Sequence, residues 1–229
     1  MRLESLGGVL LSASCALIAC QTSPSSPEED AGTPPADAGV PDAGLLPDAG
    51  LARSSRNNLR FKGPERLSAD FAAALALPEE QVCNELGRYP CTAQVHRVTL
   101  GGVDPYNNEL YEPLPATGVT SPLAVDRVAL AACTQRVTID LTTPSSGVLF
   151  GHIPLDAQGR LVDRTGTPVK EALTALYQRV LLRDPTAAEV EAFFQLASDI
   201  ETSSSVQPGR DWMKAACFAV LSSAESVFF

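Results

Sequence analysis

Apolar residues that recur every three or four positions dominate the chain after its first quarter, and this spacing predicts a mainly helical fold. Leu67, Phe71 and Leu75 lie four apart and predict a first helix. A second helix is predicted over residues 78–87, because Pro favours a first turn and Gly follows a last turn. A third helical segment is predicted over 92–100, although its β-branched residues leave a strand open.

The longest predicted helix covers residues 122–140. Ser121 is its expected N-cap, and Leu123, Leu130 and Val137 repeat every seven residues along it. We therefore expect these three side chains to face the core.

The last third of the chain predicts a small β-hairpin at 153–162 and then three helices. The first of these begins at Thr167. Thr186 and Glu189 form a capping-box pattern for the second, and residues 212–221 form the last. The expected fold class is mainly α, an irregular helical bundle with long loops, a small β-hairpin and disulfide staples.

The N-terminal 19 residues follow a different pattern, a mostly apolar stretch that ends at a cysteine. The run Leu17-Ile18-Ala19-Cys20 resembles the lipobox of bacterial lipoproteins, and this resemblance implies a signal peptide over 1–19 and a lipid (palmitate among its acyl groups) on Cys20. Gln21 resembles the pattern of lipoproteins sorted to the outer membrane, with a domain that faces the periplasm or the surface. An ordinary signal peptide or a short membrane helix are the alternatives, but a spanning helix needs about 20 apolar residues.

Residues 20–59 are expected to be a lipidated cysteine followed by a disordered Pro/Ala/Asp/Gly linker. Between residues 21 and 52 the chain has no Lys or Arg. Its acids, Glu28, Glu29, Asp30, Asp37, Asp42 and Asp48, supply −6 of the net charge of −10. Such a linker would span about 30 Å as a coil and about 100 Å when extended. The remainder, 60–229, is expected to be a single domain with subregions 60–143 and 165–229.

A short basic stretch joins the linker to this domain and contains Arg53, Arg56, Arg60 and Lys62. We expect no nucleic-acid partner, because the stretch lacks interleaved aromatic residues and the whole chain is acidic. A solvated junction between linker and domain, with contact to anionic membrane head groups as an option, is the better interpretation.

Four cysteines remain for the domain once Cys15 is lost with the signal and Cys20 is lipidated. An even number of cysteines in an exported domain indicates two disulfides. Three connectivities are open, and we favour Cys83–Cys91 with Cys133–Cys217. We expect no metal and no cofactor, because the chain has no Cys-x-x-Cys or His-Glu-x-x-His pattern. A metal site of His96, Cys91 and Cys83 would require reduced thiols.

Residues 177–189, together with 221–225, weakly resemble helical modules of uncharacterised exported bacterial proteins, several of which accompany haem-binding domains. The resemblance implies a helical C-terminal third and no activity.

No motif of a known active site is present, and Gly-x-Ser-x-Gly is absent. The candidate binding surface is the long loop that carries Asp104, Tyr106, Glu109, Tyr111 and Glu112. The competing interpretation is that both tyrosines pack this loop onto the helices. The sequence therefore favours a membrane-anchored envelope lipoprotein that acts as a structural, binding or accessory subunit, with other envelope proteins as partners. The alternative is an envelope hydrolase that uses His96 and acids of the 104–112 loop.

Overall fold

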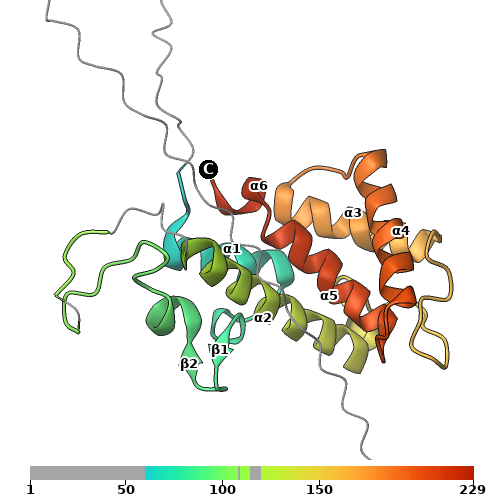
Figure 1. Ribbon diagram of the computed structural model, residues 1–229, viewed down its shortest axis with the longest axis horizontal. Helices are drawn as coiled ribbons and strands as arrows, with labels where there is room; N and C mark the ends of the chain where they lie inside the picture. The colour runs from blue at the N-terminus through green and yellow to red at the C-terminus, as the bar shows by residue number, and fades with distance from the viewer. Residues whose placement is uncertain (1–59, 108, 114–119) are drawn as a thin grey trace, which may run out of the picture. The chain divides into compact units, whose positions relative to one another are not determined.

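The computed structural model describes residues 60–107, 109–113 and 120–229, and most of the regular structure within them is helical (Figure 1). All of these residues belong to the compact unit Ser54–Phe229. The predicted mainly helical, disulfide-stapled fold is confirmed. Its helices are α1 (Gly63–Leu75), α2 (Thr120–Thr142), α3 (Thr167–Leu181), α4 (Ala187–Thr202), α5 (Pro208–Leu221) and α6 (Ala224–Val227). The shorter elements are 3₁₀ turns η1 (Glu79–Gln81) and η3 (Pro144–Ser146), a π-helical turn η2 (Cys91–Val95), and strands β1 (Asn84–Glu85) and β2 (Tyr89–Pro90).

Helix α5 is the centre of the domain and packs against α2, α3, α4 and α6 (Figure 1). Its buried face includes Trp212, Met213 and Ala216. Burial of an indole requires a partner for its N–H, and Trp212 Nε1 donates to the carbonyl oxygen of Phe193 in α4 at 2.9 Å. The Cys133–Cys217 disulfide joins α2 to α5 with a Cα–Cα distance of 5.7 Å.

The buried face of α2 differs from the predicted one. Val137 is buried as expected, but Leu123 and Leu130 are 60% and 49% exposed. The buried residues of α2 include small ones such as Ala129 and Ala132, which allow neighbouring helices to approach closely. The seven-residue repeat of leucines therefore marked the wrong side of the helix.

Ser121 was also assigned wrongly as an N-cap. It lies inside α2, and its hydroxyl donates to the carbonyl oxygen of Thr99 at 2.7 Å. This bond ties the start of α2 to the segment that follows η2.

A buried ion pair fixes the end of α2. Arg136 Nη2 lies 2.7 Å from Asp140 Oδ1, and the two side chains are 4% and 0% exposed. Asp140 also accepts the backbone N–H groups of three consecutive residues after the helix, Val148, Leu149 and Phe150, at 2.8, 3.0 and 2.9 Å. Arg136 Nη1 donates to the carbonyl oxygens of Leu75 and Ala76 at the end of α1. One pair thus connects α1, α2 and the segment that leaves α2.

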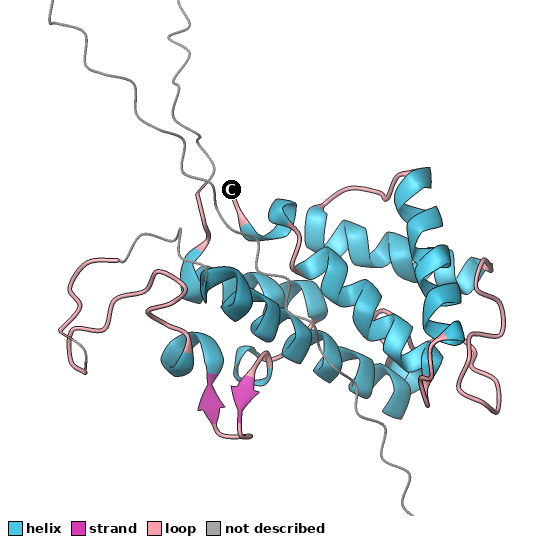
Figure 2. Cartoon of the chain, in the orientation of Figure 1, coloured by secondary structure: helices cyan, strands magenta, loops and turns pink. Residues whose placement is uncertain are grey.

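The predicted helix over 78–87 is wrong. Only the single turn η1 forms, and β1 and β2 then pair as an antiparallel hairpin (Figure 2). The Cys83–Cys91 disulfide spans the hairpin, and Cys91 N–H donates to the Cys83 carbonyl at 3.1 Å. Leu86 and Gly87 have φ of 52° and 71° at the turn, which a helix cannot contain.

The hairpin predicted at 153–162 is reduced to a single antiparallel bridge between Leu155 and Leu161. The helix predicted over 92–100 is represented only by η2 and the turns after it. The capping box of Thr186 and Glu189 is confirmed at the start of α4. Residues 212–221 are helical, but α5 already begins at Pro208 and α6 follows it, so α5 is not the last helix.

The first described residues lie against the last. Phe61 and Phe228 form an antiparallel bridge, Lys62 N–H donates to the Val227 carbonyl at 3.2 Å, and Phe229 N–H donates to the Arg60 carbonyl at 2.9 Å. The two ends of the domain are thereby fixed at one corner.

Both predicted disulfides are present. Such bonds are typical of proteins outside the reducing cytoplasm, so the domain belongs to a non-cytoplasmic compartment. The boundaries predicted at 1–19 and 20–59 lie outside the described residues and stay predictions.

Replacing Asp140 by Asn should lower the free energy of unfolding by about 3–5 kcal/mol, because it leaves the Arg136 guanidinium buried without its counter-charge. Urea titration followed by the fluorescence of Trp212, the single tryptophan of the chain, measures this change. Asp126→Asn on the same helix is the control and should change stability by no more than about 0.5 kcal/mol. A loss below about 1 kcal/mol for Asp140→Asn would show that the pair does not hold the fold together.

The two disulfides should contribute unequally. Removal of Cys133–Cys217 as a double alanine variant should cost about 4.5 kcal/mol, and removal of Cys83–Cys91 about 2.5 kcal/mol, because the longer loop loses more chain entropy when it is closed. Urea titration of both double variants checks the order. Alkylation of any of these cysteines without a reductant, detected by peptide mass, would contradict the bridges themselves.

Candidate functional site

One candidate site is a groove of about 660 Å³ between the end of α2, the turn at 155–159 and the start of α5. We call it the Arg210 groove. Cavities of this size accommodate small ligands or a few residues of a longer one. Its walls carry hydroxyl and amide side chains beside apolar ones: Thr138, Leu141, Thr142, Leu155, Asp156, Ala157, Gln158, Gly159, Val206, Gln207 and Arg210.

A tight turn builds one wall of the groove. Asp156 Oδ1 accepts the backbone N–H groups of Gln158 and Arg160 at 2.9 and 2.8 Å. The turn then lies directly on α5, where Gly209 N–H donates to the Gly159 carbonyl at 2.7 Å. A Cβ at Gly209 would lie 2.7 Å from the backbone carbonyl oxygen of Gly159, so glycine permits this approach without a shift of the turn.

Arg210 supplies the positive charge of the groove. Its Nη1 donates to Gln207 Oε1 at 3.3 Å and its Nη2 donates to Thr138 Oγ1 at 3.2 Å. Its Nε is buried and has no hydrogen-bond partner among the described residues. Within that part of the chain no carboxylate lies within 4 Å of the guanidinium. Because a guanidinium binds carboxylates in a planar fork, Arg210 can receive an acidic group from a ligand.

The predicted binding loop is exposed. Tyr106 and Tyr111 are 95% and 75% exposed, so the interpretation that both pack onto the helices is wrong. Asp104 Oδ1 accepts the backbone N–H and the Nδ2 of Asn107 at 3.2 and 3.0 Å, and Asp104 forms a β-bridge with Leu110. Glu109 and Glu112 are also exposed. These contacts order the loop locally, and its role in binding stays a prediction.

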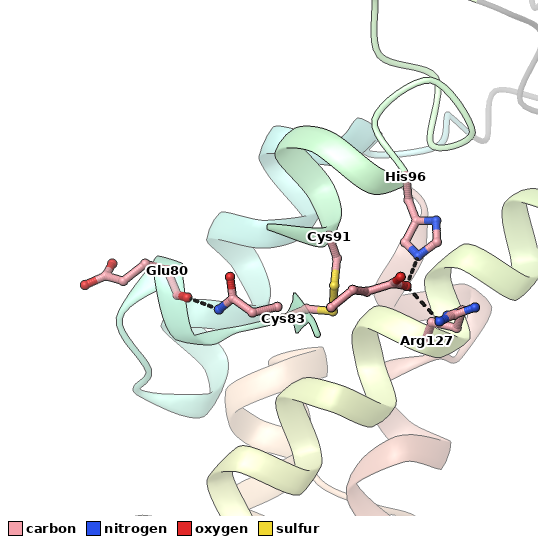
Figure 3. The surroundings of a disulfide bond; sticks show 7 residues. Glu80, Cys83, Cys91, His96 and Arg127 are labelled. Atoms are coloured by element: carbon pink, nitrogen blue, oxygen red, sulfur yellow. Dashed lines mark hydrogen bonds and ion pairs between the residues drawn. A yellow bond between two sulfur atoms is a disulfide. The ribbon is translucent and has the colours of Figure 1, made fainter. Parts of the chain in front are cut away.

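His96 lies beside the Cys83–Cys91 disulfide (Figure 3). Its Nε2 lies 2.9 Å from Glu85 Oε1, and Arg127 Nη2 lies 2.8 Å from the same oxygen. The side chain of His96 is 14% exposed. The carboxylate at His96 therefore comes from the hairpin and not from the 104–112 loop, so these contacts give the hydrolase hypothesis no support. The other histidine, His152, is exposed in a turn.

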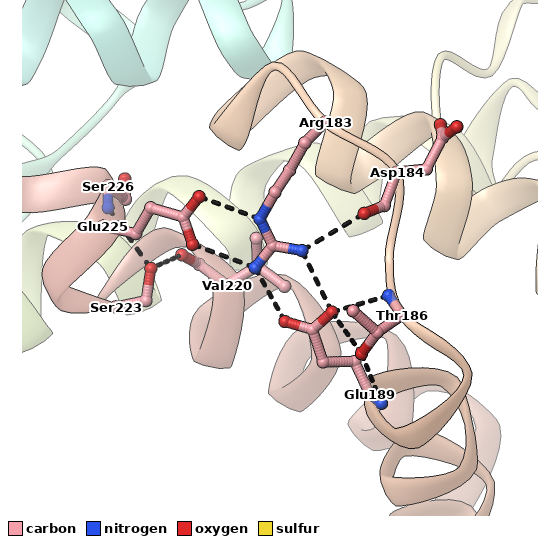
Figure 4. Close-up of polar contacts among 8 residues, drawn as sticks. All are labelled: Arg183, Asp184, Thr186, Glu189, Val220, Ser223, Glu225 and Ser226. Atoms are coloured by element: carbon pink, nitrogen blue, oxygen red, sulfur yellow. Dashed lines mark hydrogen bonds and ion pairs between the residues drawn. The ribbon is translucent and has the colours of Figure 1, made fainter.

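Another polar cluster joins residues 177–189 to residues 221–225, the two segments that resemble helical modules of exported bacterial proteins (Figure 4). Arg183 donates to Glu189 from Nη1 and Nη2 at 3.0 and 2.7 Å, and to Glu225 from Nε and Nη2 at 2.8 and 2.9 Å. Its guanidinium carbon lies 5.1 Å from the centroid of the Tyr177 ring. The cluster connects the end of α3 with the starts of α4 and α6, and its groups are all occupied with one another, so its role is structural.

These contacts shift pKa values. The hydrogen bonds from Arg183, followed by that from the Thr186 backbone, lower the pKa of Glu189 from 4.5 to about 2. Arg183 also lowers the pKa of Glu225. In return, hydrogen bonds to Glu189 and then Glu225 raise the pKa of Arg183.

The Arg210 groove was missed at the sequence level because its walls come from three segments far apart in the chain. Gln207, Pro208 and Gly209 before Arg210 are typical of a helix start and carry no ligand signal of their own. Only the side-by-side packing of α2 and α5, which the Cys133–Cys217 pairing implies, could have indicated it.

Comparison with known proteins adds no assignment: no family model, curated protein or solved structure matches the chain. Among residues 60–107, 109–113 and 120–229, no helix is long and apolar enough to cross a membrane. The same residues contain no group of three or more His, Cys, Asp or Glu side chains that could hold a metal ion.

The Arg183 cluster predicts a pH dependence of stability. Since Glu189 and Glu225 have lower pKa values in the folded domain than in the unfolded chain, their stabilisation is fully present above about pH 4.5 and is lost as the pH falls toward about 2. Arg183→Gln should flatten the fall in stability over this interval, measured by urea titration at a series of pH values. Arg164→Gln, which removes an arginine paired with Glu201 instead, should retain the wild-type slope. An unchanged slope in Arg183→Gln would contradict the assignment.

Proposed function

We propose that this chain is an exported lipoprotein, acylated at Cys20 and held at the outer membrane, whose helical domain is a binding or accessory subunit of the cell envelope. The proposal is supported by the lipobox pattern at residues 17–20 and by two disulfides that suit a compartment outside the cytoplasm. It assigns binding rather than catalysis to the domain.

The observation that carries the binding role is the guanidinium of Arg210 in its groove, without a carboxylate partner among the residues described. The hydroxyl and amide groups of Thr138, Thr142 and Gln158 offer further hydrogen bonds along the same walls, and Leu141 and Val206 offer apolar contact. A short peptide with a free carboxylate uses all three kinds of group. We therefore assign such peptides as the ligand class.

The anchor is tested by Cys20→Ala. This variant should lose incorporation of a labelled fatty acid and should leave the outer-membrane fraction, whereas Cys15→Ala should retain both. The near-native fluorescence of Trp212 should persist in Cys20→Ala, because the domain folds around its own core. Full acylation of Cys20→Ala would reject the lipobox interpretation, and unfolding of residues 60–229 would show that the anchor is not separable from the domain.

The groove is tested by titrating the full chain with short acidic peptides that carry a free C-terminal carboxylate, and with their amidated forms. Arg210→Gln should weaken binding of the free-carboxylate peptides about tenfold or more, because a charge-assisted hydrogen bond is lost. Arg160→Gln is the matched control, since Arg160 is exposed near the same turn but does not line the groove. Equal affinity of wild type and Arg210→Gln, or no binding by wild type, would reject this site.

A further inference from the structure

A second cavity, of about 370 Å³, collects positive charge in an acidic protein. Lys62, Arg66 and Arg179 line it with a single carboxylate, Asp70, so its charged lining sums to +2 while the whole chain carries −10. We call it the basic pocket. Such a local excess of cations against the net charge attracts anions at short range.

Hydrogen-bond donors remain free in the basic pocket after its internal contacts are made. Asp70 binds Lys62 Nζ at 2.9 Å and Arg66 Nε at 2.8 Å. Arg179 donates through Nε and Nη2 to the carbonyl oxygens of Ala74 and Ala73 at the end of α1. Within the described residues nothing accepts from the two terminal amino groups of Arg66, whose side chain is 62% exposed, or from Nη1 of Arg179. These donors suit the oxygens of a phosphate group.

Apolar side chains border these cations. Leu182 lines the basic pocket and is 88% exposed, and Phe229 is 64% exposed with its ring centroid 5.8 Å from Lys62 Nζ. A soluble phosphate would gain nothing from exposed Leu and Phe. Cations beside exposed apolar groups are instead the arrangement found where proteins meet the head-group region of a bilayer.

The basic pocket lies where the chain enters the domain. Lys62 is two residues after the first described residue and is held there by its hydrogen bond to Val227. Arg53 and Arg56 come shortly before it in the sequence. The stretch from Cys20 therefore joins the domain beside this pocket.

We propose that the basic pocket binds the phosphate of an anionic lipid head group in the membrane that carries the anchor. The inference rests on the proposed lipid anchor, which brings this corner of the domain to a bilayer. Arg66 and Arg179 contact the phosphate oxygens, while Leu182 and Phe229 contact the head-group boundary.

Hydrogen–deuterium exchange of the full, acylated chain in vesicles tests this. Vesicles of phosphatidylcholine with phosphatidylglycerol should protect amides of residues 62–70 and 179–183, and vesicles of phosphatidylcholine alone should not. Arg66→Gln should lower the docking equilibrium that this protection reports in anionic vesicles about fivefold, the factor for one basic side chain near an anionic surface. Arg164→Gln, which also removes one exposed arginine of an ion pair, should retain the wild-type protection.

Equal protection in both kinds of vesicle, or wild-type protection in Arg66→Gln, would overturn the proposal. The same exchange measurement is repeated with inorganic phosphate added to the chain in detergent. Protection of the same amides by phosphate alone would replace the lipid by a soluble anion and would also overturn it. The mass of the N-terminal peptide reports acylation separately, so a failed anchor is distinguished from a failed pocket.

Discussion

The buried ion pair of Arg136 and Asp140 is the contact on which the arrangement of α1, α2 and the segment after α2 depends. Removing two charges from water is costly, and the cost is offset only where further hydrogen bonds complete the pair. Here Asp140 accepts three backbone N–H groups and Arg136 reaches two carbonyl oxygens at the end of α1. The pair lies on the last turns of α2, next to Thr138 and Leu141, so it also holds one wall of the Arg210 groove.

The spacing of apolar residues and the even number of cysteines predicted most of the long helices and the presence of two disulfides. The helices around Phe71 and Leu173 and the capping box of Thr186 follow from local rules and appear in the structure. Cysteine parity indicated two disulfides, and the favoured one of the three connectivities is the one observed. The predictions failed where tertiary contacts outweigh local preference. In α2, Ala129 and Ala132 are buried whereas Leu123 and Leu130 are exposed, because close helix packing favours small residues. A short disulfide loop replaced the helix at 78–87. Charged residues are normally exposed, so no pattern could indicate that Arg136 and Asp140 are buried together, or that Arg210 would meet the 155–159 turn.

The candidate sites differ in whether their charged groups are already paired within the domain. The Arg183 cluster is saturated by Glu189 and Glu225 and serves stability. The guanidinium of Arg210 has no carboxylate partner among the described residues, and the basic pocket retains donors on Arg66 and Arg179, so both can bind anions. They lie at different places in the fold: the groove lies between the end of α2 and the start of α5, whereas the cations of the pocket lie at the start of α1 and on α3. Under the proposed lipid anchor, the basic pocket would contact lipid and the groove would bind a separate ligand.

Asp140 holds the segment after α2 against the core by accepting three of its backbone N–H groups. Hydrogen exchange of the Val148, Leu149 and Phe150 amides in the wild-type chain tests it most directly. These amides should exchange as slowly as those of α5, because opening them requires the buried pair to separate. Exchange as fast as that of the exposed residues 156–158 would contradict the account.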